Sequence, residues 1–289
     1  MRDMECLQKL LTGALAMMLY APVLVAGDVC DGVQDRQEDC KNGKGTAIVA
    51  HRGYWNCEKA GYARNSLAAL KCAQEAGFWG SEFDVNMTSD EVLLVYHDSS
   101  IDGKPIEKTP YSEFRDVRLE NGEPVPTVDD FFAQVKKCPG TVMVYELKSH
   151  STTELENRLV DLTIDKLEEY GLASPDKVIF ISFSINICKR LAMLMPGYTV
   201  QYLADDLSPE DLAGFGISGV DYHFSVFSRH PDWYKSARMH SMSVNAWTVD
   251  KEKDMNDMFS VGVDMLTTDK PDVARSLLGE KEVKPGNGK

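Results

Sequence analysis

Positive charge is scarce in this chain. Its 289 residues include 31 Lys and Arg against 45 Asp and Glu, which gives a formal net charge of −14 at pH 7. Nucleic acids and anionic membranes bind basic protein surfaces that release their counterions. We therefore expect neither of them as a partner. An anionic substrate would have to be met locally, by a few cations or by a bound metal.

Several sequence signatures are absent as well. No GxGxxG motif follows the first strand-like run, which argues against a dinucleotide-binding open sheet. The cysteines show neither a CxxC motif nor a Cys/His spacing that would indicate zinc. There is no internal repeat, Pro-rich linker or low-complexity tract. With 43% hydrophobic and 26% charged residues, the composition indicates an ordinary globular protein with a full core.

The N-terminal segment predicts export. Arg2 and Lys9 flank a thin n-region, and residues 10–26 are nearly free of charge. We expect a secretory signal peptide over residues 1–27, with cleavage near Gly27. The mature protein would then be secreted or periplasmic and would have no stable membrane span. Because acidic residues weaken the n-region, an uncleaved anchor is the alternative.

Cysteine usage fits an exported protein. Cleavage would leave six cysteines, at positions 30, 40, 57, 72, 138 and 188. An even number permits disulfides but does not assign them. The pair that we favour joins Cys30 to Cys40 and would close a short polar loop. Cys72 and Cys188 lie in apolar helical patterns, and the alternative for them is a buried free thiol.

Short apolar runs alternate with amphipathic stretches along most of the chain. The runs cover residues 46–53, 80–88, 91–98, 141–148, 177–184, 218–225, 243–250 and 262–269, with one more from residue 198. The clearest helical patterns cover residues 66–75, 128–137, 153–170, 185–195, 231–240 and 251–259. This alternation indicates parallel strands joined by crossover helices.

The number of runs predicts the fold class. With residues 91–97 taken as a hairpin arm or as a barrel strand, about eight strands remain, which favours a TIM (β/α)8 barrel over an open sheet. The barrel would cover residues 46–279, between a polar lead-in at 28–45 and a polar tail at 280–289. The irregular stretch 98–126 is long enough to carry function or to cover something.

Charged residues gather where the first predicted strands end, which is where barrel enzymes place their active residues. The four sets are His51 and Arg52, Glu82 and Asp84, His97 and Asp98, and Glu146 and Lys148. Alternation along a strand puts Glu82 and Asp84 on one face. The same holds for Glu146 and Lys148. We expect these faces to converge in one barrel mouth.

Three of these side chains predict a metal site. Clustered carboxylates at Glu82, Asp84 and Glu146 raise one another's pKa unless a cation lies between them. Oxygen ligands suit a hard divalent cation, Mg²⁺ or Ca²⁺. Taken singly, a Glu-x-Asp pair on a strand is often a helix cap or a surface feature. Four charged sets at four successive strand ends favour chemistry, because buried charge is costly without a purpose.

The remaining charged side chains suit phosphoryl transfer. Arg52 and Lys148 can bind phosphate oxygens, one as a planar fork and the other as a point charge. His51 and His97 can serve as an acid and base pair near neutral pH. The alternatives are a structural histidine at a strand end and an ordinary Glu-x-Lys ion bridge.

The same residues form an ordered set of motifs. Along the chain these are His51-Arg52-Gly53, Asn65-Ser66, Glu82-Phe83-Asp84-Val85, Thr88-Ser89-Asp90, His97-Asp98, LENGEPVPT at 119–127, Glu146-Leu147-Lys148, Trp247-Thr248-Val249-Asp250 and GVDMLTTDKP at 262–271. The set resembles the glycerophosphodiester phosphodiesterase family over about residues 46–273.

The resemblance implies a TIM barrel of the phospholipase C-like phosphodiesterase type, with a short insertion at residues 99–126. It also implies hydrolysis of a small-molecule glycerophosphodiester to sn-glycerol 3-phosphate and an alcohol. The implied roles are metal ligation by Glu82, Asp84 and Glu146, acid and base catalysis by His51 and His97, phosphate binding by Arg52 and Lys148, and a place beside the glycerol for Trp247. A core tryptophan on a late strand is the alternative for the last residue.

One position departs from the family pattern. Arg64 stands where the family usually has the Glu of Pro-Glu-Asn, so a negative group near the site has become positive. We expect Arg64 either to pair with an anionic leaving group or to point to solvent and pair with a surface carboxylate. Asn65 and Ser66 are still expected to start the first helix.

Two rival functions follow from the same motifs. A phospholipase D-like or sphingomyelinase D-like lipid phosphodiesterase shares the fold and a similar arrangement of histidines and acids. The Glu-x-Lys and Trp-Thr-Val motifs favour the small-diester family instead. A catalytically silent binding protein is the other rival, and the intact set of ligands and bases argues against it.

Overall fold

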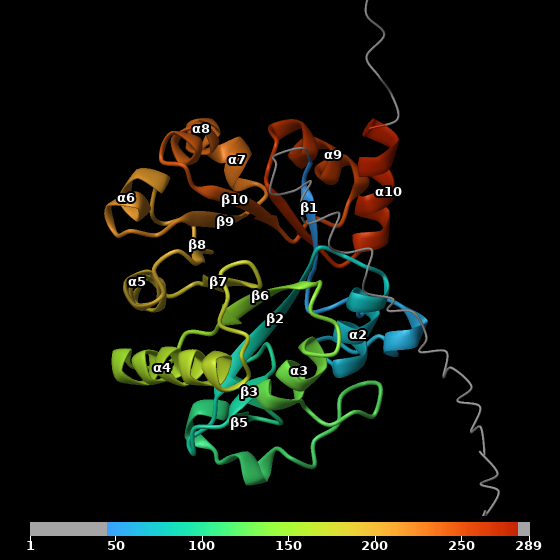
Figure 1. Cartoon of the computed structure of the whole chain (residues 1–289), viewed down its shortest axis with the longest axis vertical. Coiled ribbons are helices and arrows are strands. Elements are labelled where there is room, and N and C mark those ends of the chain that lie inside the picture. The colour runs from blue at the N-terminus through green and yellow to red at the C-terminus, as the bar shows by residue number, and fades with distance from the viewer. Residues whose placement is uncertain (1–44, 283–289) are drawn as a thin grey trace, which may run out of the picture.

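Eight parallel strands close into a barrel. The computed structural model describes residues 45–282. The barrel strands are β1 (Ala47–Ala50), β2 (Gly80–Met87), β6 (Val142–Leu147), β7 (Val178–Ser182), β8 (Thr199–Tyr202), β9 (Gly219–His223), β10 (Ser243–Trp247) and β11 (Met265–Thr268). Each pairs with the next in this order, and β1 pairs with both β2 and β11, so the sheet has no open edge. The predicted TIM barrel is confirmed (Figure 1).

Helices surround the strands. They are α2 (Leu67–Glu75), α3 (Val128–Val135), α4 (Thr153–Glu169), α5 (Ile185–Leu194), α6 (Pro209–Gly214), α7 (Val226–Arg229), α8 (Pro231–Met239), α9 (Glu252–Val261) and α10 (Pro271–Glu282). Every predicted helix is present within two residues at each end. The short helices α6 and α7 were not predicted, because helices of six and four residues are too short for a periodic pattern. Helix α10 was not predicted either, and it extends to Glu282, inside the segment expected to be a polar tail.

Strand alternation decides which side chains reach the barrel interior. On β6, Val142 and Val144 belong to the apolar cluster inside the barrel, and Glu146 follows them on the same face. On β2, Phe83 belongs to the core between sheet and helices, where its ring packs on Tyr145 at 4.7 Å between centroids. The neighbouring positions on β2 therefore project their carboxylates inward.

The third run, at residues 91–98, is a hairpin arm and not a barrel strand. Its core, β3 (Leu93–Val95), pairs antiparallel with the end of β2. Of the two alternatives for residues 91–97, the hairpin arm is therefore confirmed. Strand β2 continues past the mouth, and β3 runs back, so that the Tyr96 amide donates to the Asp84 carbonyl at 3.0 Å. The return places His97 level with the carboxylates of β2.

The insertion at residues 99–126 has a small core of its own. It contains the two-stranded ribbon β4 (Ser100–Ile101) and β5 (Lys104–Pro105) and the 3₁₀ turns η2 (Ile106–Lys108) and η3 (Tyr111–Glu113). Ile106, Phe114 and Val125 are buried together there with Leu94 of β3. Figure 1 shows this segment, in green, beside β3 and beyond the barrel. The insertion is therefore a packed flap at the edge of the mouth and not an irregular loop.

Three of the cysteines in the described part are free thiols. Cys72 and Cys188 are buried, as the alternative for them predicted, and Cys57 is half-buried. Cys138 is disulfide-bonded. The favoured bond between Cys30 and Cys40 lies outside the described residues, as do the expected signal peptide and most of the lead-in. Within residues 45–282, no helix is both long and apolar enough to cross a membrane.

Candidate active site

A tight turn after β1 carries the first two site residues. Arg52 (φ 55°) and Gly53 (φ 78°) both adopt the left-handed conformation. A Cβ atom on Gly53 would lie 2.7 Å from the Cβ atom of Ala69, so only glycine fits there. The left-handed conformation is unfavourable for arginine, and such strain often marks a functional site. Here it lets the Arg52 amide donate to Oε2 of Glu82 at 2.7 Å.

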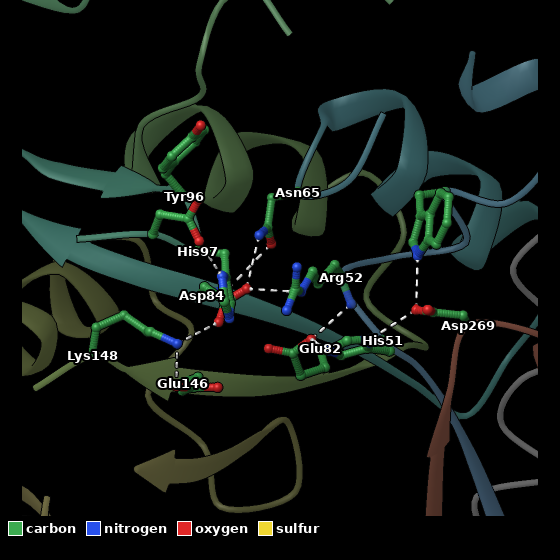
Figure 2. A network of polar contacts seen from close by, with 12 residues as sticks. His51, Arg52, Asn65, Glu82, Asp84, Tyr96, His97, Glu146, Lys148 and Asp269 are labelled. Atoms are coloured by element: carbon green, nitrogen blue, oxygen red, sulfur yellow. Dashed lines mark hydrogen bonds and ion pairs between the residues drawn. The ribbon is translucent and has the colours of Figure 1, made fainter. Parts of the chain in front are cut away.

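Three carboxylates meet inside the mouth, as the strand alternation predicted. Oxygen atoms of Glu82, Asp84 and Glu146 all lie within 4.8 Å of one another, and all three residues are buried (Figure 2). Oε1 of Glu82 has no hydrogen-bond partner among the described residues. A buried, unpaired carboxylate oxygen beside two other acids fits a divalent cation well, because a cation offsets both the burial and the repulsion.

The pKa values of these carboxyls diverge. Burial, with Asp84 and Glu146 adding to it, raises the pKa of Glu82 well above its usual value. Burial and the neighbouring Asp84 raise the pKa of Glu146 to about 7. Burial alone would also raise the pKa of Asp84, but the nearby Lys148, His97 and Arg52 hold it below its usual value. In the absence of a cation, each of the two glutamates would therefore hold a proton more tightly than Asp84 does.

Two cations border the carboxylates. The Lys148 ammonium lies 2.7 Å from Oε1 of Glu146 and 3.1 Å from Oδ1 of Asp84. Nε of Arg52 lies 3.6 Å from Oδ2 of Asp84 and has no hydrogen-bond partner within the described chain. Figure 2 shows both side chains directed at the same aspartate. An anionic phosphoryl group placed between them would meet two positive charges in a largely buried setting.

Each histidine of the predicted pair has an aspartate at Nδ1. His51 Nδ1 lies 2.7 Å from Oδ1 of Asp269, and its Nε2 lies 4.0 Å from Oε2 of Glu82. His97 Nδ1 lies 2.6 Å from Oδ1 of Asp98. Because a carboxylate only accepts, each Nδ1 carries the hydrogen, which leaves each Nε2 free to exchange a proton with substrate. Burial lowers the pKa of His97 below the usual value for histidine.

Two pockets meet at Arg52 and His97, which line both. The first, which we call the Trp247 pocket, has a volume of about 250 Å³ and is lined by His51, Arg52, Glu82, His97, Glu146, Ile181, Phe183, Leu203, Asp221, Trp247, Thr248 and Thr267. The second, which we call the insertion pocket, has about 360 Å³ and is lined by Arg52, Arg64, Asn65, Tyr96, His97, Asp98, Ile101, Asp102, Val117, Arg118, Leu119 and Glu120. A phosphodiester at the shared residues would have one pocket for each of its two alcohols.

Arg64 is exposed to solvent, as one of the two expected arrangements has it, but it does not pair with a surface carboxylate among the described residues. Its guanidinium carbon lies 3.8 Å from the centroid of the Trp55 ring, which is a cation–π contact. Arg64 also lines the insertion pocket. Trp247 lies at the end of β10 and is half-buried, and Phe183 packs edge-on against its ring at 5.5 Å. Its indole lines the Trp247 pocket and also packs against the apolar cluster inside the barrel, so each of the two expectations holds in part.

Sequence reasoning missed several polar contacts at this site. One of them is the contact by which Asp269 orients His51. Asp269 ends the strand-like run at 262–269, so the rule that active residues follow barrel strands could have identified it. Trp55, whose Nε1 donates to the same Asp269 oxygen at 2.9 Å, left no signal in the sequence. The expectation that Asn65 and Ser66 start the first helix is confirmed for Ser66, which is the N-cap of α2. Asn65 has another role and donates to Oδ2 of Asp84 at 2.8 Å.

Comparisons with known proteins agree with the site. A model of the glycerophosphoryl diester phosphodiesterase family matches residues 51–273. A glycerophosphodiester phosphodiesterase of Caldanaerobacter subterraneus is 26% identical over 252 residues, which are 81% of this chain and 98% of that one. The crystal structure of a glycerophosphodiester phosphodiesterase from Parabacteroides distasonis is 41% identical, with a TM-score of 0.79 over 82% of this chain and 98% of that one.

A more distant structure has a similar fold. An Oleispira antarctica phosphodiesterase in complex with its product sn-glycerol 3-phosphate superposes with a TM-score of 0.70 over 81% of this chain and 97% of that one. At 21% identity, this likeness concerns the fold alone.

Proposed function

This chain belongs to the glycerophosphoryl diester phosphodiesterase family and hydrolyses glycerophosphodiesters. We propose that the reaction takes place in the barrel mouth and releases sn-glycerol 3-phosphate and an alcohol. One observation carries the proposal: a buried cluster of three carboxylates, bordered by two cations and two histidines, lies beside two pockets that share Arg52 and His97. Each group in it has a place in phosphodiester hydrolysis.

Glu82, Asp84 and Glu146 would hold one divalent cation, Ca²⁺ or Mg²⁺. Both ions prefer oxygen ligands, and the unpaired oxygen of Glu82 supports such an assignment. When bound, the cation would polarise a phosphoryl oxygen and offset the charge that grows there.

Arg52 and Lys148 would hold the phosphate. Arg52 lies at the junction of the two pockets, and Lys148 contacts two of the three carboxylates. Both side chains are largely withdrawn from solvent, so their charges act through a weakly screening medium. They would orient the diester and stabilise the negative charge that develops on its oxygens in the transition state.

The two histidines divide the proton transfers by position. His51 lines only the Trp247 pocket, which we assign to the glycerol, so it would accept the proton of the attacking oxygen, from water or from a glycerol hydroxyl. Attack by the glycerol hydroxyl would form a cyclic phosphodiester, which water then opens to sn-glycerol 3-phosphate. His97 lies between the pockets, so it would protonate the oxygen of the departing alcohol. Burial lowers the pKa of His97, which makes its imidazolium a stronger acid.

The pockets favour a small polar substrate over an intact lipid. Volumes of about 250 and 360 Å³ suit a glycerol and a head group. A third of the lining of the insertion pocket consists of the charged residues Arg64, Arg118, Asp102 and Glu120. Acyl chains would need a long apolar groove instead. This contrast argues against the phospholipase D-like and sphingomyelinase D-like alternatives.

We also propose that the enzyme acts outside the cytoplasm, secreted or in a periplasm. The expected signal peptide at residues 1–27 is one support for this placement. The disulfide at Cys138 is the other, because such bonds persist in oxidising compartments.

The test is a substrate panel assayed with and without EDTA. Glycerophosphodiesters of choline, ethanolamine, serine and inositol should yield sn-glycerol 3-phosphate, and intact phospholipids should not react. EDTA should abolish turnover, and added Ca²⁺ or Mg²⁺ should restore it. Undiminished turnover in excess chelator would remove the metal assignment, and faster cleavage of intact phospholipids would favour the lipase alternative.

A further inference from the structure

A carboxyl group in the wall of the Trp247 pocket has no partner for one of its oxygens. Asp221 is the third residue of β9, and it is 1% exposed. Its Oδ1 atom has no hydrogen-bond partner in the part of the chain that the structure describes. The same residue lines the pocket together with His51 and Trp247. A buried polar atom without a partner costs free energy, and one that borders a pocket points to a ligand.

The neighbours of Asp221 are already engaged. The Asn245 side chain lies close enough to the Asp221 carboxyl to lower its pKa against the effect of burial. Asn245 also donates to Oγ1 of Thr267 at 3.0 Å, and its own oxygen accepts from the Ala246 amide at 2.8 Å. Oδ1 of Asp221 therefore gains nothing from this group and remains available to a molecule in the pocket.

The carboxyl suits a hydroxyl group better than a charged one. Burial raises the pKa of Asp221 well above its usual value, and the negative Glu146 adds to the effect. A neutral carboxyl both donates and accepts a hydrogen bond, and so does an alcohol. A ligand anion at this point would be repelled by Glu146 and the other acids of the mouth.

Other residues that line the pocket suit a short carbon chain. Phe183, Leu203 and Trp247 line the pocket with apolar surface. Nε1 of Trp247 donates to the backbone carbonyl of Asp221 at 2.8 Å, which holds the indole at a set position relative to the carboxyl. A three-carbon polyol could then pack its carbons on the indole and direct one hydroxyl at Oδ1.

We propose that Asp221 binds a hydroxyl group of the glycerol moiety and thereby selects glycerophosphodiesters over phosphodiesters of simple alcohols. The proposal rests on the proposed function, because it places the glycerol in the Trp247 pocket. It assigns Asp221 to substrate selection and gives it no part in the proton transfers.

Calorimetric titration of the protein in Ca²⁺ buffer tests the proposal without any turnover. The two ligands are sn-glycerol 3-phosphate and n-propyl phosphate, which share the phosphate and the three carbons but differ in the hydroxyls. The wild-type protein should bind the glycerol compound about tenfold more tightly, the worth of one good hydrogen bond to a buried group. Asp221→Val, which keeps the volume but removes the polar atoms, should bind the two compounds about equally.

Two further variants separate selection from folding. Asp221→Asn should keep most of the preference, because an amide also donates and accepts. Glu156→Gln alters a buried carboxyl that bonds Ser184 outside the pocket, and it should keep the full preference. Equal binding of both compounds by the wild-type protein, failure of both to bind, or an unchanged preference in Asp221→Val would overturn the proposal.

Turnover of glycerophosphocholine, measured in parallel, tests the proposed function independently of the titrations, which test the role of Asp221. A wild-type protein that turns over the diester but shows no preference between the two ligands contradicts only the role of Asp221. A protein that prefers the glycerol compound but hydrolyses no diester contradicts only the proposed function.

Discussion

The Nδ1 atom of His51 lies 2.7 Å from Oδ1 of Asp269, although 218 positions of the chain separate the two residues. His51 follows β1 and Asp269 follows β11, and these strands are neighbours because the barrel closes on itself. Asp269 is an acceptor from both His51 and Trp55, and these bonds hold its pKa below the usual value against the effect of burial. The first and last strands thus share the task of orienting one imidazole.

Removal of Asp269 should impair catalysis more than removal of Asp98. Asp269→Ala should lower kcat about 10- to 100-fold, the range seen when a partner that orients a functional histidine is lost. Asp98→Ala should cost less, because the Asp98 side chain is 68% exposed and water can replace it at His97, whereas the Asp269 side chain is 23% exposed. Steady-state kinetics on glycerophosphocholine checks both. Equal losses would contradict an orienting role specific to Asp269.

The histidines themselves should be essential. His51→Ala and His97→Ala should each lower kcat roughly 10²- to 10⁴-fold, the usual contribution of a positioned acid or base. Both residues line the open mouth and not the core, so the melting temperature should change little. Steady-state kinetics checks the expected loss of kcat, and thermal melts of the same samples check the unchanged melting temperature. Wild-type kcat in either variant would exclude that histidine from the mechanism.

Metal binding should weaken as the pH falls. Burial and Asp84 raise the pKa of Glu146 to about 7, and below that pH the cation must displace a proton from the carboxyl. Apparent Ca²⁺ affinity should therefore fall roughly tenfold per pH unit below 7 for this one proton. The rise in melting temperature on adding Ca²⁺ should be larger at pH 8 than at pH 5.5. Glu146→Gln has no such proton, so its smaller response to Ca²⁺ should lose the part of the pH dependence that Glu146 contributes and keep the part that comes from the raised pKa of Glu82.

Arg64 should influence the choice of head group. It stacks on Trp55 at the edge of the insertion pocket, where an anionic leaving group would meet its charge. Arg64→Glu should lower kcat/KM for glycerophosphoserine relative to glycerophosphocholine by several-fold, with glycerophosphoethanolamine and glycerophosphoinositol completing the panel. Arg64→Gln is the control for the loss of charge without reversal. Identical substrate ratios in all three proteins would show that Arg64 does not set specificity.

Strand-end residues account for most of what the sequence predicted correctly. Glu82, Asp84 and Glu146 converge because their spacing on inward-facing positions is a local property of the strands, and barrel closure then brings those faces together. The hairpin arm was one of two alternatives for residues 91–97. The antiparallel pairing with β2 in the structure decided between them. An apolar run in the sequence does not indicate whether the strand pairs parallel or antiparallel with its neighbour.

The sequence by itself determined the barrel, the inward-facing carboxylates and the presence of two histidines at its mouth, because the hydrophobic period and the residue types are local properties of the chain. Only the tertiary structure decided that Asp269 orients His51, that Arg64 stacks on Trp55 instead of pairing with a carboxylate, and that an oxygen of Asp221 is unpaired beside a pocket. Each of these depends on contacts between side chains whose positions are set by packing, and packing joins residues that no local pattern relates.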